Sequence, residues 1–289
     1  MGLVELRPLF QEHSALAEAC LLAANYIVGS RDLTIVAMGK FGGRELSYGS
    51  DLDIMFVGHD HRAAQNLLSV LSAPSPHGIV ATADVRLRPE GEKGPLVASL
   101  EAFEAYYRDR AQLWEIQALT RARPVVGPYQ ASFREIAHAA WSIVGRDLQL
   151  FQKINAMLQR IRRERGSGDD ALDFKTGQGG MVEAEFFVQG LQMHYDIRET
   201  STYRAIEKLA GAISAADAGV LTRAYEFLRR CETALRRWQD KSVSTLPADP
   251  AEQRKLAIRM GCKDYESWKH DYEQARERVH TVYQKYFAR

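Results

Sequence analysis

This sequence has few cysteines and no marked excess of positive or negative charge. Three cysteines occur in 289 residues, far apart at Cys20, Cys231 and Cys262. Their odd number and wide spacing fit reduced core thiols better than a disulfide framework or a zinc knuckle. The 38 basic and 37 acidic residues leave a net charge of +1, without the basic excess of a nucleic-acid binder. We therefore expect a reducing compartment and no nucleic-acid partner.

Long apolar runs are also missing. The longest nearly apolar run, Ala19–Val28, is too short to span a bilayer, and Met1–Phe10 has charged residues in place of a signal core. Apolar residues make up 46% of the chain and charged ones 26%, which is ordinary globular usage. The length allows two compact domains. We expect a folded cytoplasmic protein that does not insert into a membrane.

The strand signals lie in the first third of the chain. Leu33–Met38 and Leu52–Val57 are short β-rich apolar runs, and Ile79–Leu87 is a third run with clearer alternation. Helical spacing over Arg62–Ser72 predicts a helix between the second and third runs. The strand signal disappears after Pro95. The sequence thus predicts an α+β fold with a small mixed sheet near its start.

Helical patterns follow from about residue 100 to the end. Apolar residues recur every three or four positions from Leu221 to Trp238, which predicts an amphipathic helix whose apolar stripe is core. Two prolines and a glycine within RARPVVGP indicate a domain boundary. We place it at residue 128, giving an α/β domain over 1–128 and an all-α domain over 129–289.

The sharpest local feature is the segment GKFGGRELSYGSDLDIMF, Gly39–Phe56. Asp51 and Asp53 are two residues apart, which on a strand places both carboxylates on one face, where they could bind a divalent metal. Without a cation, their mutual repulsion and lost hydration would raise their pKa values. The alternating positions supply the packing on the other face: Leu52, Ile54 and Phe56.

A third acid, Asp84, lies in the next β-like run and is followed by Arg86 and Arg88. Three acids on adjacent strands could hold two Mg²⁺ ions, while the arginines face phosphate oxygens. The alternative is a surface cluster of aspartates and arginines.

Two glycines in the same segment are candidates for phosphate binding. Gly42 and Gly43 would let backbone amides approach a triphosphate, and Ser50 beside Asp51 joins them as a candidate. The spacing is neither a Walker A loop nor G-x-G-x-x-G, which disfavours a P-loop kinase or a Rossmann enzyme. The alternative is that the glycine pair forms an ordinary turn.

A second glycine-rich segment, DFKTGQGG, precedes a helical stretch and suits an anion at a helix start. Lys175 could reach a nucleotide or phosphate there. The alternative is a hinge in which the charges of Asp173, Lys175 and Glu185 pair.

Other conspicuous residues favour structural roles. We expect Trp114 in the core and Glu115 in a buried ion pair with Arg121 or Arg123. The segment GHDH, with histidines at 59 and 61, and the arginine-rich stretch LQRIRRERGSG are interpreted as solvated surface.

Four ordered blocks resemble one known family. They are GKFGGRELSYGSDLDIMF, DVRLRPEGEKGPLVAS, WEIQALTRARPVVG and DFKTGQGGMVEAEFFVQ, and they extend from about residue 33 to 195. Their order is similar to that in the glutamine synthetase adenylyltransferase family. The resemblance implies a polymerase-β-like nucleotidyltransferase domain followed by a helical-bundle domain, with Asp51, Asp53 and Asp84 as metal-binding and catalytic acids.

The resemblance also implies an activity. Family members are longer chains with two catalytic halves, one adding AMP to a tyrosine of glutamine synthetase and one removing it by phosphorolysis. This chain has room for one half. We expect ATP as substrate, or ADP and phosphate in the reverse reaction, and glutamine synthetase as partner. A PII-type signalling protein is a further expected partner if the chain is part of a longer one.

The implied mechanism uses two Mg²⁺ ions, which Mn²⁺ can replace. Asp51, Asp53 and Asp84 would hold the ion that activates the tyrosine hydroxyl, and the first two would hold the ion at the leaving pyrophosphate. Arg86 and Arg88 would assist, and Asp84 would accept the proton. Two alternatives stay open: a nucleotide-sensing regulatory module, or a nucleotidyltransferase with another hydroxyl acceptor.

Overall fold

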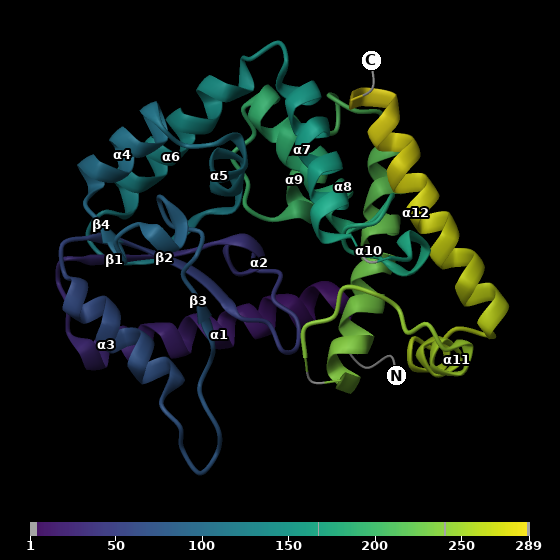
Figure 1. Cartoon of the computed structure of the whole chain (residues 1–289), viewed down its shortest axis with the longest axis horizontal. Coiled ribbons are helices and arrows are strands. Elements are labelled where there is room, and N and C mark those ends of the chain that lie inside the picture. Colours follow the sequence, from purple (N-terminus) through teal and green to yellow (C-terminus); the bar gives the residue numbers. More distant parts are fainter. Residues whose placement is uncertain (1–4, 167, 240, 288–289) are drawn as a thin grey trace.

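The computed structural model describes residues 5–166, 168–239 and 241–287. A small sheet with helices on both faces forms one side of the molecule, and a group of helices forms the other (Figure 1). The fold is therefore α+β, as predicted. In the described ranges, no helix is long and apolar enough to cross a membrane. All three cysteines are free, and Cys231 is buried.

Five strands make a mixed sheet of order β3-β2-β1-β5, with β4 also paired to β2. The central pair is antiparallel and joins Leu33 to Gly58 at one end and Ala37 to Ile54 at the other. β5 is antiparallel to β1, whereas β3 and β4 are parallel to β2. The strands are β1 (Leu33–Ala37), β2 (Leu52–Gly58), β3 (Ala83–Asp84), β4 (Val97–Ala98) and β5 (Arg123–Val126).

The strands predicted over 33–38 and 52–57 are confirmed, but two other strand predictions are wrong. Only Ala83–Asp84 of the run over 79–87 is a strand, and Ile79 and Val80 are about half exposed. The sequence also shows no strand signal after Pro95, yet two strands follow there. β4 pairs with β2, and β5 pairs with β1 across a long sequence gap. Pairing partners far away in sequence leave little local signal in strands of two to four residues.

Alternation along β1 and β2 directs side chains to two different hydrophobic clusters. Ile54 and Phe56 pack beneath α1 (Leu6–Val28) and α3 (His61–Ser72), whereas Met55 and Val57 face the helices on the other side. The Asp60 side chain caps α3 by accepting from the Ala63 amide at 2.9 Å. The helix predicted over 62–72 is therefore confirmed.

The other face of the sheet is covered by helices that follow β4 and β5 in the chain (Figure 1). Phe103 of α4 and Phe133 of α6 pack there, with ring centroids 4.9 Å apart. This cluster continues without a break into the helical side. The three helices between the sheet and the helical side are α4 (Leu100–Asp109), α5 (Leu113–Ala118) and α6 (Gln130–Gly145).

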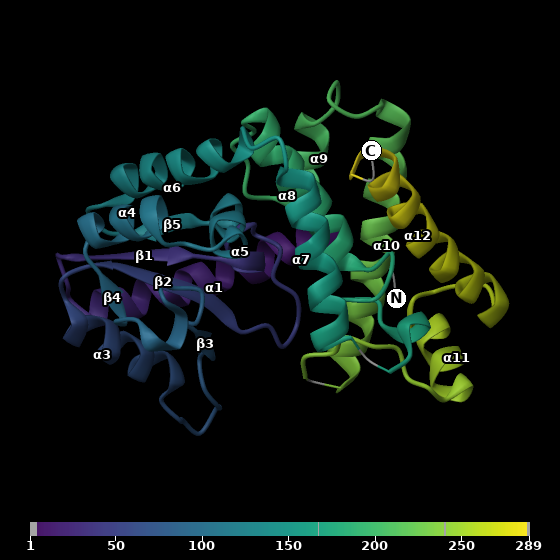
Figure 2. The ribbon, with the colours of Figure 1, turned by 45° about the horizontal axis from the view of Figure 1, so that its top comes forward.

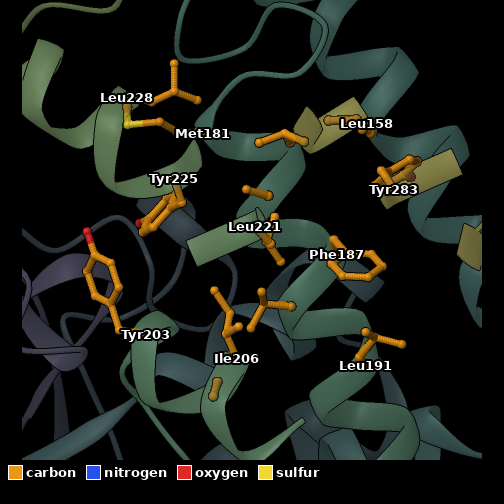
Figure 3. Packing of buried hydrophobic residues seen from close by; sticks show 14 of the residues in the cluster. Leu158, Met181, Phe187, Leu191, Tyr203, Ile206, Leu221, Tyr225, Leu228 and Tyr283 are labelled. Atoms are coloured by element: carbon orange, nitrogen blue, oxygen red, sulfur yellow. The ribbon is translucent and has the colours of Figure 1, made fainter. Parts of the chain in front are cut away.

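The helical side is organised around α8 and α10 (Figure 2). Buried residues of α7 to α10 and α12 interdigitate there, with Phe187 and Tyr225 among the largest (Figure 3). The helices are α7 (Leu150–Arg165), α8 (Met181–Tyr195), α9 (Thr202–Lys208), α10 (Ala215–Gln239), α11 (Pro250–Arg259) and α12 (Tyr265–Phe287).

The predicted helix over 221–238 is confirmed as part of α10, with one exception. Leu221, Leu228 and Leu235 are buried as expected, but Trp238 is 62% exposed. Its ring lies 3.8 Å from the guanidinium of Arg259. The proposed boundary at residue 128 falls in the turn between β5 and α6 and stays a prediction, because one hydrophobic cluster extends across it.

Candidate functional site

The acids singled out in the sequence meet where β2 and β3 run side by side. Asp53 on β2 and Asp84 on β3 are register partners in a parallel pair, so their side chains share one face of the sheet. Leu52 and Ile54 point to the cluster under α1 and α3, which sends Asp53 to the opposite face, as predicted. Asp51 immediately precedes β2.

Asp53 is enclosed by the turn that follows β1. The short helix α2 (Gly39–Gly42) begins with Gly39 at a φ of +53°, and a Cβ atom there would lie 2.7 Å from Asp53 Oδ2. A side chain at this position would therefore collide with the carboxylate. Burial, together with the negative charges of Asp84 and Asp51, raises the pKa of Asp53 to about 6. The nearby charges of Lys40 and Arg121 lower this pKa only in part.

The other two acids have local partners. Thr82 donates its hydroxyl to Asp51, while both oxygens of Asp84 accept from Arg86, through Nε at 2.9 Å and Nη2 at 2.5 Å. The hydrogen bonds from Arg86 lower the pKa of Asp84. Among the described residues, no three His, Cys, Asp or Glu side chains converge as metal ligands. A cation that used all three acids would require Arg86 to release Asp84.

The residue types nevertheless fit a hard divalent ion. Carboxylate oxygens are the ligands that Mg²⁺ and Mn²⁺ prefer. The raised pKa of Asp53 shows that the three negative charges are close enough to repel, and a bound cation would relieve that repulsion. Their role as metal ligands stays a prediction.

The two glycines predicted to bind phosphate have other partners in the structure. The amides of Gly42 and Gly43 donate to Met38 and Gly39 at 2.8 and 3.1 Å, so both amides are already engaged. A Cβ atom at Gly42 would lie 1.8 Å from the carbonyl oxygen of Arg121. These distances explain the glycines by close packing, and their binding role stays a prediction.

Three more candidates have their own partners or neighbours. Ser50 accepts from Arg236 Nη1 at 3.0 Å, which ties the loop before β2 to α10. Arg88 donates to three carbonyls of its own loop, including that of Val85 at 2.8 Å. Lys175 lies near Lys40, whose pKa is lowered to about 8 mainly by burial and to a small extent by the charge of Lys175. The binding role of Lys175 stays a prediction.

The glycine-rich segment before α8 is packed rather than open. A Cβ atom at Gly179 would lie 2.0 Å from the carbonyl oxygen of Arg276. Asp173 accepts from the amides of Lys175 and Thr176 at 3.0 and 2.7 Å and thereby shapes the turn. The Glu185 carboxylate accepts from the Tyr225 hydroxyl at 2.8 Å. These contacts support a structural role for much of this segment.

The predictions for Trp114 and Glu115 are wrong. Trp114 is 44% exposed. Glu115 is buried, but it accepts from the Gln112 amide at 2.8 Å and from the Tyr106 hydroxyl at 2.5 Å, so it caps its helix instead of pairing with an arginine. Arg121 pairs instead with Glu45, a partner that no local sequence pattern indicates.

The histidine segment is a surface feature, as predicted, whereas the arginine-rich segment is so only in part, because Arg162 is 14% exposed and pairs with the buried Glu183. His59 and His61 are exposed, and His59 lies 3.1 Å from the carboxylate of Asp32. In the arginine-rich end of α7, Arg160 is 71% exposed and pairs with Glu164 one turn away.

A buried group of charged residues beside the acids was missed. Lys40 of α2 lies 3.2 Å from Glu232 of α10, and Arg121 lies 2.7 Å from Glu45. We call this group the interhalf charge network, because it joins elements around the sheet to α8 and α10. It consists of Lys40, Glu45, Arg121, Glu185, Arg229, Glu232 and Arg236.

A partial signal for this network is present in the sequence. Lys40 and Glu45 lie inside the same glycine-rich segment that leads to the aspartates. Arg229 and Arg236 alternate with the apolar residues of α10 in the sequence, yet both are buried. Both pair with Glu232 of the same helix, and Arg229 also lies 3.8 Å from Glu45, so each buried cation has a carboxylate partner.

Two family models match two successive parts of the chain. The sequence model of the glutamate-ammonia ligase adenylyltransferase family matches residues 1–137, and that of GlnD PII-uridylyltransferase matches residues 149–287.

Similar proteins include three named bifunctional glutamine synthetase adenylyltransferase/adenylyl-removing enzyme. The relative from Methylococcus capsulatus is 31% identical over 90% of this chain and 30% of its own length. The relative from Streptomyces avermitilis is 32% identical over 91% of this chain and 29% of its own length. The relative from Nitrosococcus oceani is 31% identical over 99% of this chain and 34% of its own length.

This chain thus spans about a third of the length of the curated relatives that it matches. Residues 1–137 thus match the glutamate-ammonia ligase adenylyltransferase family, and residues 149–287 match the GlnD PII-uridylyltransferase family.

Proposed function

We propose that this chain is a polymerase-β-like nucleotidyltransferase unit that transfers AMP from ATP to a tyrosine of glutamine synthetase, or removes it by phosphorolysis. The observation that carries the proposal is the parallel pairing of Asp53 with Asp84, with Asp51 just before the same strand. The names of the relatives supply the substrate and the two directions.

Asp51, Asp53 and Asp84 would hold two Mg²⁺ ions, which Mn²⁺ can replace. When bound, these ions lower the pKa of an attacking hydroxyl and neutralise charge on a leaving phosphate group. The raised pKa of Asp53 supports this assignment, because a carboxylate that repels its neighbours gains the most from a cation.

The chain's own residues have separate tasks in the forward reaction. Asp84 would accept the proton of the tyrosine hydroxyl as its oxygen bonds to the α-phosphorus and pyrophosphate leaves. Arg86, once released from Asp84, would lie within reach of the phosphate oxygens. Lys175 would add positive charge on the side of the helical half. In the reverse reaction, an oxygen of inorganic phosphate would attack the α-phosphorus of the bound AMP. The bond from this phosphorus to the tyrosine oxygen would break, the tyrosine would take up a proton, and ADP would be the product.

The helical half would present the protein substrate. Its match to a PII-uridylyltransferase model relates these helices to an enzyme that acts on a PII protein, and a PII-type protein is a candidate regulator if the chain belongs to a longer one. The proposal places nucleotide binding at the sheet and protein recognition on the helices.

Mass spectrometry of glutamine synthetase after incubation with this protein, Mg²⁺ and ATP tests the proposal. We expect the mass of one AMP to be added to a tyrosine peptide. Pre-adenylylated glutamine synthetase with phosphate tests the reverse reaction and should release ADP. The matched control is Asp53→Asn, which keeps the shape of the side chain and loses its charge. Absence of both reactions in folded wild-type protein would refute the assignment.

A nucleotide-sensing module is the second candidate, and one observation favours it. Arg86 occupies both oxygens of Asp84. Calorimetric binding of ATP without transfer in either direction would select this alternative.

A further inference from the structure

One ion pair links the acidic site to the helical half across 192 positions of sequence. The ammonium of Lys40 lies 3.2 and 3.3 Å from the two carboxylate oxygens of Glu232, whose side chain is fully buried. Lys40 belongs to the short helix α2, and Glu232 belongs to the long helix α10 (Figure 1).

Lys40 also lies near Asp53. Gly39, its neighbour in sequence, packs directly against the Asp53 carboxylate, and the Met38 amide donates to the Asp53 carbonyl at 2.8 Å. The charge of Lys40 lowers the pKa of Asp53, against the larger effect of burial. The ammonium therefore pairs with Glu232 and lies near two further acids, Glu185 and Asp53.

Glu232 is strongly held in place. Arg229 and Arg236, one turn before and after it on α10, lie 3.0 and 3.2 Å from its carboxylate. These cations and Lys40 outweigh the cost of burial and lower the pKa of Glu232 to about 2. A permanently charged, immobile carboxylate is well suited to fix the position of a flexible lysine.

An unheld lysine would change the acidic site. The Lys40 side chain is 20% exposed, and a buried ammonium requires a counterion. If Glu232 lost its charge, Glu185 and Asp53 would be the anions left near Lys40. A lysine paired with Asp53 would then compete with any divalent cation for that carboxylate.

We propose that Glu232 is a positioning residue for the acidic site, which from the helical half holds the Lys40 ammonium away from Asp53 and so keeps that carboxylate available to a cation. The inference rests on the proposed function, because it assumes that Asp53 binds a divalent ion. It makes α10 part of the catalytic unit, although no residue of α10 needs to touch the nucleotide.

Binding of Mn²⁺ alone to the full chain, followed by electron paramagnetic resonance, tests this role. Glu232→Gln should weaken Mn²⁺ binding on the order of tenfold, within the usual range of coupling between sites. Lys40→Met should bind Mn²⁺ at least as tightly as wild type, because a repelling charge is removed. The double variant should recover the affinity lost in Glu232→Gln.

This reversal separates positioning from a purely structural role. If Glu232 only stabilised the fold, the double variant would bind no better than Glu232→Gln, and that result would overturn the inference. Unchanged Mn²⁺ affinity in folded Glu232→Gln would overturn it too. Wild-type protein that binds no Mn²⁺ would refute the metal site of the proposed function and the inference together.

Two further variants control for folding. Glu183→Gln removes another fully buried carboxylate of the helical half, one held by Arg162 and His280. It should lower the melting temperature without changing Mn²⁺ affinity. If Glu232→Gln does not fold, Glu232→Asp keeps the charge but shortens its reach, and it should weaken Mn²⁺ binding about threefold. Wild-type affinity in Glu232→Asp, combined with loss of Mn²⁺ binding in Lys40→Met, would overturn the inference.

Discussion

Two sets of three carboxylates lie close together in this molecule, and the pKa of Asp53 in one set shifts in the opposite direction to those of Glu185 and Glu232 in the other. Glu45, Glu185 and Glu232 belong to the interhalf charge network, in which arginines and a lysine surround each acid. Asp51, Asp53 and Asp84 lie at the neighbouring sheet edge, where the acids face one another. Burial alone does not distinguish the sets, because Asp53 is also largely enclosed.

The pKa values record the difference. Burial tends to raise the pKa of Glu185 and Glu232, but nearby cations reverse this effect and lower both. For Asp53, burial and like charges act together, and the pKa rises to about 6. The presence of cations therefore decides whether a buried acid is a structural element or a site that is ready for a metal.

The largest effect should come from neutralising the acid that is expected to act as base. Asp84→Asn keeps the shape of the side chain but loses the basic oxygen, so single-turnover AMP transfer should fall by about 10² to 10⁴ with little change in Mg·ATP affinity. If Asp84 only pairs with Arg86, the variant would instead melt earlier and its folded fraction would retain normal turnover. Measuring melting, affinity and transfer on one preparation distinguishes these outcomes.

Within the interhalf charge network, Glu45 should respond in stability rather than in Mn²⁺ binding. Glu45→Gln leaves the buried guanidinium of Arg121 without its charged partner, so urea unfolding should show a loss of about 3 to 5 kcal/mol. Mn²⁺ affinity of the folded fraction should not change. Glu164→Gln, which removes an exposed pair with Arg160, is the control and should cost less than about 0.5 kcal/mol. Equal losses in both variants would erase the distinction between the two sets.

The pH dependence of stability should identify Asp53. Its folded-state pKa lies above the usual value near 3.8, so ionisation opposes folding, and stability present at low pH is lost as pH rises through about 6. Without divalent ions, Asp53→Asn should therefore be more stable than wild type at pH 8, by roughly 1 to 3 kcal/mol, and less so at pH 5. Chemical unfolding at both pH values checks this. A wild type that is as stable as the variant at pH 8 would show that the acids do not repel.

The smallest effect should come from Arg86. Its exposed guanidinium occupies both oxygens of Asp84, and a surface pair of this kind is worth up to about 1 kcal/mol. Arg86→Met should thus tighten Mn²⁺ binding a few-fold. Arg108→Met removes another exposed arginine that pairs with an aspartate, Asp109, and should leave Mn²⁺ binding unchanged. Weaker metal binding in Arg86→Met would show that the arginine supports the site.

Local patterns predicted the parts of the molecule that depend on local physics. Alternation from Leu52 to Phe56 fixed the orientation of Asp53, and helical periodicity located α3 and most of α10. The short strands β4 and β5 were not predicted, because their pairing partners lie far away in sequence.

Long-range pairing limits what the sequence reveals about the site. Lys40 and Glu232 are 192 residues apart, and no single-sequence pattern connects them. Arg86 and Arg88 alternate beside Asp84, yet one pairs with that acid and the other closes its own loop. The chemistry of each residue was predictable, whereas the choice among possible partners required the fold.

Calorimetric titration of ATP in Mg²⁺ and in EDTA is the most direct test of the central claim that Asp51, Asp53 and Asp84 form a cation-dependent nucleotide site. We predict clear binding in Mg²⁺, a large loss of affinity in EDTA, and a similar loss in Asp53→Asn with Mg²⁺ present. Equal affinity in Mg²⁺ and EDTA, unaffected by Asp53→Asn, would contradict the claim.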